Sequence, residues 1–249
     1  GDLCISRPKA RLNWGIELPF DSDYVTYVWF DALTNYISAI GYPDKEDEFK
    51  KWWPVDTHLI GKDILTTHAV YWPTMLMAAE LPLPKTIFAH GWWLMGDTKM
   101  SKSLGNVVRP LDLANEFGVD ALRYFLMREM TPGQDANFTM DAFITRYNSD
   151  LANDLGNLVN RITKLIGRNF DYELPDPGEA APEDADLNQH VLGLPQKVSD
   201  ELDQMRVNYA ITHVFDVLRE INRYLEDTAP WKLMKTDKAR GGAVLYNAA

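Results

Sequence analysis

Residues 58–64 read His58-Leu59-Ile60-Gly61-Lys62-Asp63-Ile64. The first three form a short apolar run that is typical of a buried strand, and the glycine and charged residues after it indicate a turn. An amphipathic pattern then predicts a helix to about Ala79, which Asp63 is placed to cap. A further strand is predicted over residues 86–89. Strands separated by helices favour βαβ units in a parallel sheet.

Polar residues follow each predicted strand. The β-branched and aromatic stretch Tyr24–Trp29 predicts a strand, and a helix is predicted over residues 32–40. Open parallel sheets bind their ligands beyond the carboxyl ends of the strands. Asp31, residues 61–63 and residues 90–91 fall at such ends, so we expect them to share one site.

The second half of the chain is predicted to be helical. Two short helices are expected between about 111 and 130, broken near Gly118, and one long helix from Met140 to about Arg168. The acidic, proline-containing stretch 171–186 carries seven acids and no base, which predicts a loop or linker. Amphipathic helices are expected over 187–227. The predicted fold class is therefore α/β followed by an all-α bundle.

Composition limits the class of protein. Of the 249 residues, 46% are hydrophobic and 24% charged, and no apolar run reaches the roughly 18 residues of a spanning helix, so no membrane partner is expected. The single cysteine, Cys4, excludes a disulfide framework or a cysteine-rich zinc site in this chain, and the reducing cytoplasm is the expected location. The net charge of −11 argues against a nucleic-acid partner, but the acids of 171–186 account for much of it.

Residues 99–103 read Lys99-Met100-Ser101-Lys102-Ser103 and form a short polar loop. Lysine ammonium groups are compact charges that suit phosphate oxygens, and serine hydroxyls add donors. The loop therefore predicts a clamp for a triphosphate, against the alternative of an ordinary solvated loop.

This loop, with Gly105-Asn106 and Pro110 after it, resembles the signature of class I aminoacyl-tRNA synthetases. Within that class, the sequence of residues 27–36 resembles the amino-acid pocket segment of the methionyl-tRNA synthetase family. The segments 58–64 and 68–73 resemble the central segment of that family, and the resemblance extends along essentially the whole chain.

The resemblance implies three regions. Residues 1–110 would form the C-terminal half of a Rossmann-like catalytic domain, and residues 111–139 connecting helices that contact the tRNA stem. Residues 140–249 would form a helical anticodon-binding bundle. A His-Ile-Gly-His-type motif, which class I synthetases carry, is absent from the chain. The chain therefore resembles an internal piece of a longer enzyme, and we expect the piece alone to be inactive or nearly so.

The implied reaction is the ATP-dependent activation of methionine to methionyl-adenylate, followed by transfer to methionine tRNA. The partners are ATP, L-methionine and methionine tRNA, with Mg²⁺ accompanying ATP; zinc would belong to an insert outside this chain. The resemblance assigns the catalytic roles to Lys102, Lys99 and Ser101, and the ATP contacts to Gly61, Asp63, His90, Gly91 and Lys102. Asp63 as a helix cap and His90 as a core histidine are the alternatives.

A methionine pocket follows from the same resemblance. A thioether is polarizable and packs well against aromatic rings, and His68 would add a polar contact near the sulfur. The implied contacts are Trp29, Ala32, Leu33, Tyr36, Ile64, His68 and Trp72. The alternative is that these are plain core residues. Leu33 and Thr67 depart from residues that are common in the family.

The implied anticodon contacts are Asn157, Arg161 and Trp231. The first two are four residues apart and share one face of a helix, where an amide and a guanidinium can read base edges. Trp231 can stack on an unstacked base. The alternatives are a helix–helix contact for Asn157, a surface ion pair for Arg161 and a core anchor for Trp231.

Two other functions remain open at this point. One is a related synthetase for leucine, isoleucine, valine or cysteine, against which the pocket segments argue. The other is a tRNA-binding module without catalysis, which would have no need of the lysine loop at 99–103.

Overall fold

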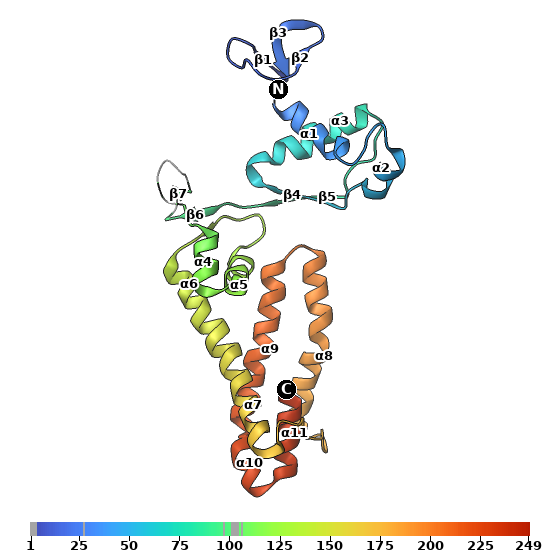
Figure 1. Cartoon of the computed structure of the whole chain (residues 1–249). Helices are drawn as coiled ribbons and strands as arrows, with labels where there is room; N and C mark the ends of the chain where they lie inside the picture. The colour runs from blue at the N-terminus through green and yellow to red at the C-terminus, as the bar shows by residue number, and fades with distance from the viewer. Residues whose placement is uncertain (1–3, 27, 97, 101–104, 106) are drawn as a thin grey trace. The chain divides into compact units, whose positions relative to one another are not determined.

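The structure, a computed structural model, describes the chain except for residues 1–3, 27, 97, 101–104 and 106 (Figure 1). Ser101 and Lys102, two of the predicted catalytic residues, lie outside the described residues. The chain divides into two compact units, Gly1–His90 and Gly91–Ala249. Each unit is described by itself.

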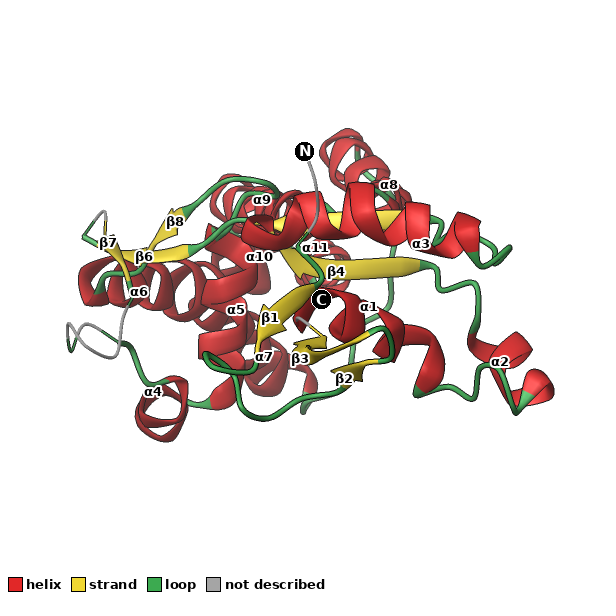
Figure 2. Ribbon diagram, turned by 90° about the horizontal axis from the view of Figure 1, so that it is seen from above, coloured by secondary structure: helices red, strands yellow, loops and turns green. Residues whose placement is uncertain are grey.

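The first unit opens with a small antiparallel sheet in the order β1-β3-β2 (Figure 2). Its strands are β1 (Ser6–Pro8), β2 (Glu17–Leu18) and β3 (Asp21–Thr26). The strand predicted over 24–29 is thus wrong in its second half, because β3 ends at Thr26. It is also wrong in its pairing, because β3 belongs to an antiparallel sheet and not to the expected parallel one.

Val28 begins helix α1 (Val28–Ser38), and Asp31 lies in its first turn instead of at a strand end. Leu33 and Ile37 are both buried and four residues apart. That spacing places them on one helix face, and burial of this face outweighs the strand propensity of the aromatic residues before it.

The parallel pair predicted around residue 58 is confirmed. Strand β4 (Thr57–Gly61) pairs with β5 (Thr86–His90) in parallel, from Thr57 opposite Thr86 to Gly61 opposite His90. The crossover is helical and ends as predicted near Ala79. It consists of a 3₁₀ turn, η1 (Lys62–Ile64), a π-helical segment, η2 (Thr67–Tyr71), and α3 (Trp72–Ala78). Gly61, not Asp63, occupies the N-cap, so the capping role predicted for Asp63 is wrong.

Helix α2 (Glu46–Trp52) completes the core of the first unit. One buried cluster joins α1, α2 and α3, and its members are Leu33, Ile37, Phe49, Trp53, Trp72 and Leu76. This core holds α1 and α3, which carry most of the predicted pocket residues, against each other.

The second unit begins with a small sheet in the order β7-β6-β8. Its strands are β6 (Trp93–Met95), β7 (Thr98–Lys99) and β8 (Ala136–Asn137). Helices α4 (Pro110–Phe117) and α5 (Val119–Glu129) follow β7 in the chain. Gly118 between them has a φ of 90°, which favours glycine, and the predicted break is confirmed.

The long helix predicted from Met140 is confirmed, with one departure. It runs without interruption through α6 (Met140–Arg146), a π-helical segment, η4 (Tyr147–Gly156), and α7 (Asn157–Phe170). Apolar periodicity does not reveal the π segment, because its neighbours on both sides are ordinary α-helix.

Four further helices form a bundle together with α7 (Figure 1). They are α8 (Pro182–Asp203), α9 (Val207–Thr228), α10 (Pro230–Thr236) and α11 (Lys238–Ala248). Leu158, Ile162 and Ile166 of α7 pack with Leu225 of α9 and Val244 of α11 in one buried cluster. Among the described residues, no helix is long and apolar enough to span a membrane.

The acidic stretch predicted to be a loop ends inside a helix, because α8 already begins at Pro182. Asp184 is only 1% exposed. Arg240 of α11 donates two hydrogen bonds of 2.7 Å to its carboxylate, and the Tyr224 hydroxyl of α9 donates a third. A partnered, buried carboxylate here joins three helices, which explains why a strongly acidic segment becomes ordered.

We expect Asp184 to make the bundle sensitive to acid. The bonds from Arg240 lower the pKa of Asp184 from 3.8 to about 2. Its charged form therefore stabilises the folded state at neutral pH by about 2 kcal/mol, and this contribution is lost as pH falls from about 4 toward 2. Urea unfolding of Asp184→Asn should show a deficit against wild type that is full near pH 6 and shrinks toward pH 2.

The matched control for this prediction is Glu183→Gln, which removes a more exposed carboxylate bound to the same arginine. Its deficit should be small at every pH. A deficit of Asp184→Asn that did not change with pH would contradict the assignment.

Candidate functional site

Four aromatic side chains predicted to line a pocket come together in the first unit. Trp29 and Tyr36 lie on α1, and His68 and Trp72 lie on the helical segment after β4. The Tyr36 ring centroid is 5.7 Å from that of His68 and 5.9 Å from that of Trp72, and Trp29 meets His68 edge-on at 6.4 Å. These rings lie close together because the core packs α1 against α3, and α3 directly follows the helical segment that carries His68.

The hydrogen bonds of His68 determine its tautomer. The ring is 2% exposed, and its Nδ1 lies 3.0 Å from the carbonyl oxygen of Ile64. A carbonyl oxygen only accepts, so Nδ1 carries the proton. In the neutral ring Nε2 then accepts from the Tyr36 hydroxyl, 3.0 Å away. The Tyr36 hydroxyl hydrogen and the His68 Nδ1 hydrogen are thus both donated to atoms of the protein, so neither is directed at the side chain of a bound amino acid.

The residues predicted to line the pocket differ in their exposure. Leu33 and Trp72 are each 1% exposed and belong to the core cluster, which fits the alternative that they are core residues. Tyr36 is 38% exposed, and Ala32 is also exposed. Ile64 is half-buried and contributes its carbonyl oxygen to His68.

Two predicted ATP contacts lie at the carboxyl ends of the parallel strands. Gly61 ends β4 and His90 ends β5, and the two residues are direct partners in the register. Asp63 lies two residues beyond Gly61, in the exposed part of the 3₁₀ turn. This is the edge of a parallel sheet at which ligands bind.

Gly91 has a clear structural reason to be glycine. A Cβ atom at this position would lie 1.8 Å from the carbonyl oxygen of Gln134 and 2.3 Å from its carbonyl carbon. Beside it, the Trp92 amide donates to Asp135 at 2.8 Å. Residues 91–92 therefore pack directly on residues 134–135 of the same unit, whether or not a nucleotide is bound nearby.

Lys99 is the one described member of the predicted catalytic set. It ends strand β7, and its Nζ lies 4.1 Å from the ring centroid of Trp92. A lysine over an aromatic face is held by a cation–π interaction. Trp92 therefore orients the lysine at the start of the 99–103 loop.

Among the described residues, no group of three or more His, Cys, Asp or Glu side chains could hold a metal ion.

Two of the predicted anticodon residues, Asn157 and Arg161, lie together on α7. Arg161 of α7 reaches across to α9, where its guanidinium lies 3.5 Å from the Asn222 amide oxygen and 4.0 Å from the Glu226 carboxylate. Asn157 donates to Asn153, one turn earlier in the same long helix, at 3.3 Å. Both line a polar cavity of about 360 Å³ between α7 and α9.

Trp231 lies just beyond the C-terminal end of α9. Only Ala229 separates α9 from α10, and Glu226, which Arg161 contacts, precedes Trp231 by five residues. The Trp231 side chain is 39% exposed, so the core-anchor alternative is wrong for it.

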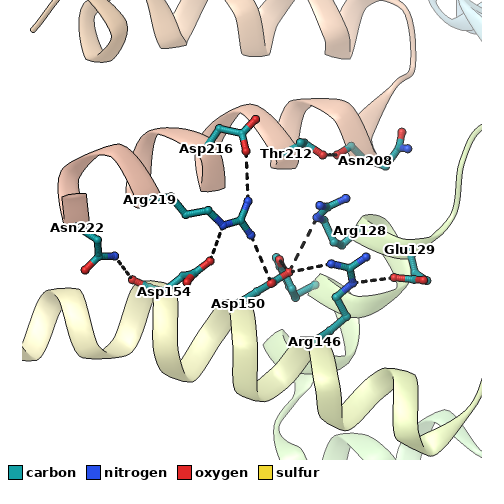
Figure 3. A network of polar contacts seen from close by, with 11 residues as sticks. Arg128, Glu129, Arg146, Asp150, Asp154, Asn208, Thr212, Asp216, Arg219 and Asn222 are labelled. Atoms are coloured by element: carbon teal, nitrogen blue, oxygen red, sulfur yellow. Dashed lines mark hydrogen bonds and ion pairs between the residues drawn. The ribbon is translucent and has the colours of Figure 1, made fainter. Parts of the chain in front are cut away.

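A polar network positions η4, the segment before α7, against α9 (Figure 3). Arg219 of α9 binds Asp154 at 2.7 Å and lies 3.6 Å from Asp150, both in the π-helical segment η4. Asn222 donates to the backbone carbonyl of Asp154 at 3.0 Å, and Arg146 lies 3.6 Å from Asp150. Asp150 is 2% exposed. The network therefore anchors the helix directly before Asn157.

The sequence predictions did not include this network or His58. Arg219 and Asn222 are more than 60 residues away from their partners Asp150 and Asp154, so no local motif joins the two helices. The sequence signal available for His58 was a histidine within a short apolar run that predicts a buried strand.

Comparisons with known proteins agree along the chain. Residues 1–163 match the family model "tRNA synthetases class I (M)", and residues 174–248 match "Anticodon binding domain of methionyl tRNA ligase". The methionine–tRNA ligases of Clostridium acetobutylicum and Caldanaerobacter subterraneus are 48% and 49% identical to it, over 99% and 100% of this chain. The chain spans only 38% and 39% of those two relatives.

A solved structure is similar as well. Mycobacterium tuberculosis methionyl-tRNA synthetase in complex with methionyl-adenylate aligns with all of this chain at a TM-score of 0.91 and 43% identity. The aligned region is 49% of that protein.

Proposed function

Since this chain belongs to the class I methionyl-tRNA synthetase family, we propose that the full-length protein is a methionine–tRNA ligase. In the first step, a carboxylate oxygen of methionine attacks the α-phosphorus of ATP, and the bond from that phosphorus to the bridging oxygen breaks. Methionyl-adenylate forms and pyrophosphate leaves. A hydroxyl of the terminal adenosine of methionine tRNA then takes the methionyl group from the adenylate, and AMP leaves.

The observation that carries this proposal is the Tyr36–His68 hydrogen bond within its aromatic surroundings. The relative from M. tuberculosis, which aligns over this whole region, binds methionyl-adenylate. In this chain, Trp29 and Tyr36 supply ring surface for a thioether, and Ala32, Leu33, Ile64 and Trp72 shape the pocket around it. Because Tyr36 and His68 satisfy each other, a polar side chain that needs a donor finds none there, which favours methionine.

The proposed nucleotide site lies where β4 and β5 end. Gly61 and His90 contact the adenosine, Asp63 accepts from ribose hydroxyls, and Gly91 leads into the loop 99–103. Lys102 neutralises charge on the departing pyrophosphate, Lys99 assists, and Ser101 orients the loop. Mg²⁺ enters with ATP as part of the substrate.

The proposed tRNA site lies on the helical bundle. We assign residues 1–110 to catalysis, 111–139 to connecting helices and 140–249 to anticodon binding. Arg161 and Asn157 present a guanidinium and an amide beside a polar cavity, and Trp231 offers an exposed ring for stacking. The reaction is proposed for the cytoplasm.

The test is amino-acid-dependent ATP–pyrophosphate exchange by the full-length protein. Methionine should support exchange, whereas leucine, isoleucine, valine and cysteine should not. Exchange with one of those four and none with methionine would replace this proposal by a related synthetase. tRNA binding without any exchange would leave a binding module. The 249-residue chain alone should show little exchange, because it contains no His-Ile-Gly-His-type motif.

A further inference from the structure

His58, a buried histidine that was not predicted as a site residue, contacts two residues of the predicted methionine pocket, Trp72 and Tyr36. His58 is the second residue of β4 and is 6% exposed. The Trp72 indole Nε1 donates to His58 Nε2 at 3.1 Å. Trp72 is 1% exposed, so an indole N–H without this acceptor would be buried without a partner.

His58 also contacts the tyrosine of the pocket. Its ring centroid lies 4.4 Å from that of Tyr36, with the planes inclined by 53°. This is the shortest of the ring separations around Tyr36, whose hydroxyl donates to His68. His58 therefore supports the Tyr36 ring from one side while His68 engages its hydroxyl.

These two contacts converge on one hydrogen bond. Trp72 follows directly after the π-helical segment η2, which carries His68, so the bond from Trp72 to His58 ties this segment to β4. The ring contact places Tyr36, which comes from α1. One side chain thus fixes both the donor and the acceptor of the Tyr36–His68 bond.

His58 must be neutral to accept at Nε2. Burial, with the neighbouring His68 adding to it, holds the pKa of His58 below its ordinary value. The neutral form is therefore the one that the fold favours near neutral pH.

We propose that His58 is a positioning residue for methionine: it fixes the Tyr36–His68 pair through Trp72 and through its ring contact with Tyr36. The proposal rests on the proposed function, because it concerns how that pocket recognises its amino acid. His58 acts through Trp72 and Tyr36 and not by touching methionine or ATP.

The experiment compares variants of the full-length protein in pyrophosphate exchange. His58→Leu removes the acceptor and should raise KM for methionine by roughly 10-fold, with kcat changed less than about threefold and KM for ATP unchanged. In His58→Gln, the amide oxygen can occupy the place of Nε2 and accept the indole hydrogen, so its KM should return most of the way to wild type.

Trp72→Phe removes the donor and leaves His58 in place. Because Trp72 also shapes the proposed pocket, the informative result is how its effect combines with that of His58→Leu: the two increases in KM for methionine should be less than additive, since both variants break the same bond. If His58→Leu fails to fold, His58→Phe replaces it, because it also lacks the acceptor and should raise KM for methionine as well.

The matched structural control is Ile60→Ala. Ile60 is two residues along the same strand, faces the same side and is 5% exposed. It should lower the unfolding temperature without changing KM for methionine. Equal increases of KM for methionine in Ile60→Ala and His58→Leu, or equal increases of KM for ATP and methionine, would overturn the proposal, as would a His58→Gln variant no better than His58→Leu. If the wild-type protein shows no methionine-dependent exchange, the proposed function itself fails.

Discussion

Lys102→Ala in the full-length protein should slow methionine-dependent pyrophosphate exchange by about 10²–10³-fold, the scale of losing one preorganised charge stabiliser. Negative charge moves onto the leaving pyrophosphate as the bond to the α-phosphorus breaks. A lysine ammonium placed there stabilises that charge more in the transition state than in bound ATP. The loss should therefore appear in kcat, while KM for methionine changes little.

The control for this prediction is Lys85→Ala. Lys85 is an exposed lysine of the first unit, and its ion pair with Asp56 lies at the surface. Removing it should leave the exchange rate within twofold of wild type. A Lys102→Ala protein with an intact kcat and a large increase in KM for methionine would show that Lys102 acts on the amino acid instead of the phosphates.

Trp231→Ala should reduce the use of methionine tRNA by about 10–100-fold in kcat/KM, because a stacked base is worth about 1–3 kcal/mol. Pyrophosphate exchange without tRNA should stay unchanged, because the exposed Trp231 ring belongs to the bundle and not to the nucleotide site. The measurement is aminoacylation at varied tRNA concentration beside exchange with the same enzyme preparation.

Tyr209→Ala is the matched control for Trp231→Ala. Tyr209 is an exposed aromatic residue, 46% accessible, in the first turn of α9, whereas Trp231 follows the last turn of that helix. The two ends of this 22-residue helix are about 30 Å apart. Tyr209→Ala should leave both reactions intact. Equal loss of exchange and aminoacylation in Trp231→Ala would instead indicate general damage to the fold.

Local patterns were sufficient for the parallel pair and for most helices. The apolar runs at 58–60 and 86–89 were each followed by a glycine-containing turn, and both became the strands β4 and β5. Gly118 marked a helix break because the positive φ at this position favours glycine, and a single residue is enough to indicate it. The fold class, α/β followed by an all-α bundle, is confirmed by the family matches and the similar structure.

Predictions failed where tertiary contacts outweighed local preference. The aromatic stretch 24–29 divides between β3 and α1 because the core requires a helical face at Leu33 and Ile37. Asp184 is ordered by Arg240, 56 residues away, and no local pattern could indicate that partner. The site roles given to individual residues came from the family resemblance and remain predictions.

The close approach at Gly91 also affects how related sequences should be compared. Any side chain at this position would collide with the carbonyl group of Gln134, so natural selection would remove substitutions here for reasons of packing alone. Invariance of this glycine among homologues would therefore be no measure of nucleotide binding. At His90, where a side chain is already accommodated, variation between homologues is the more informative record of what the site binds.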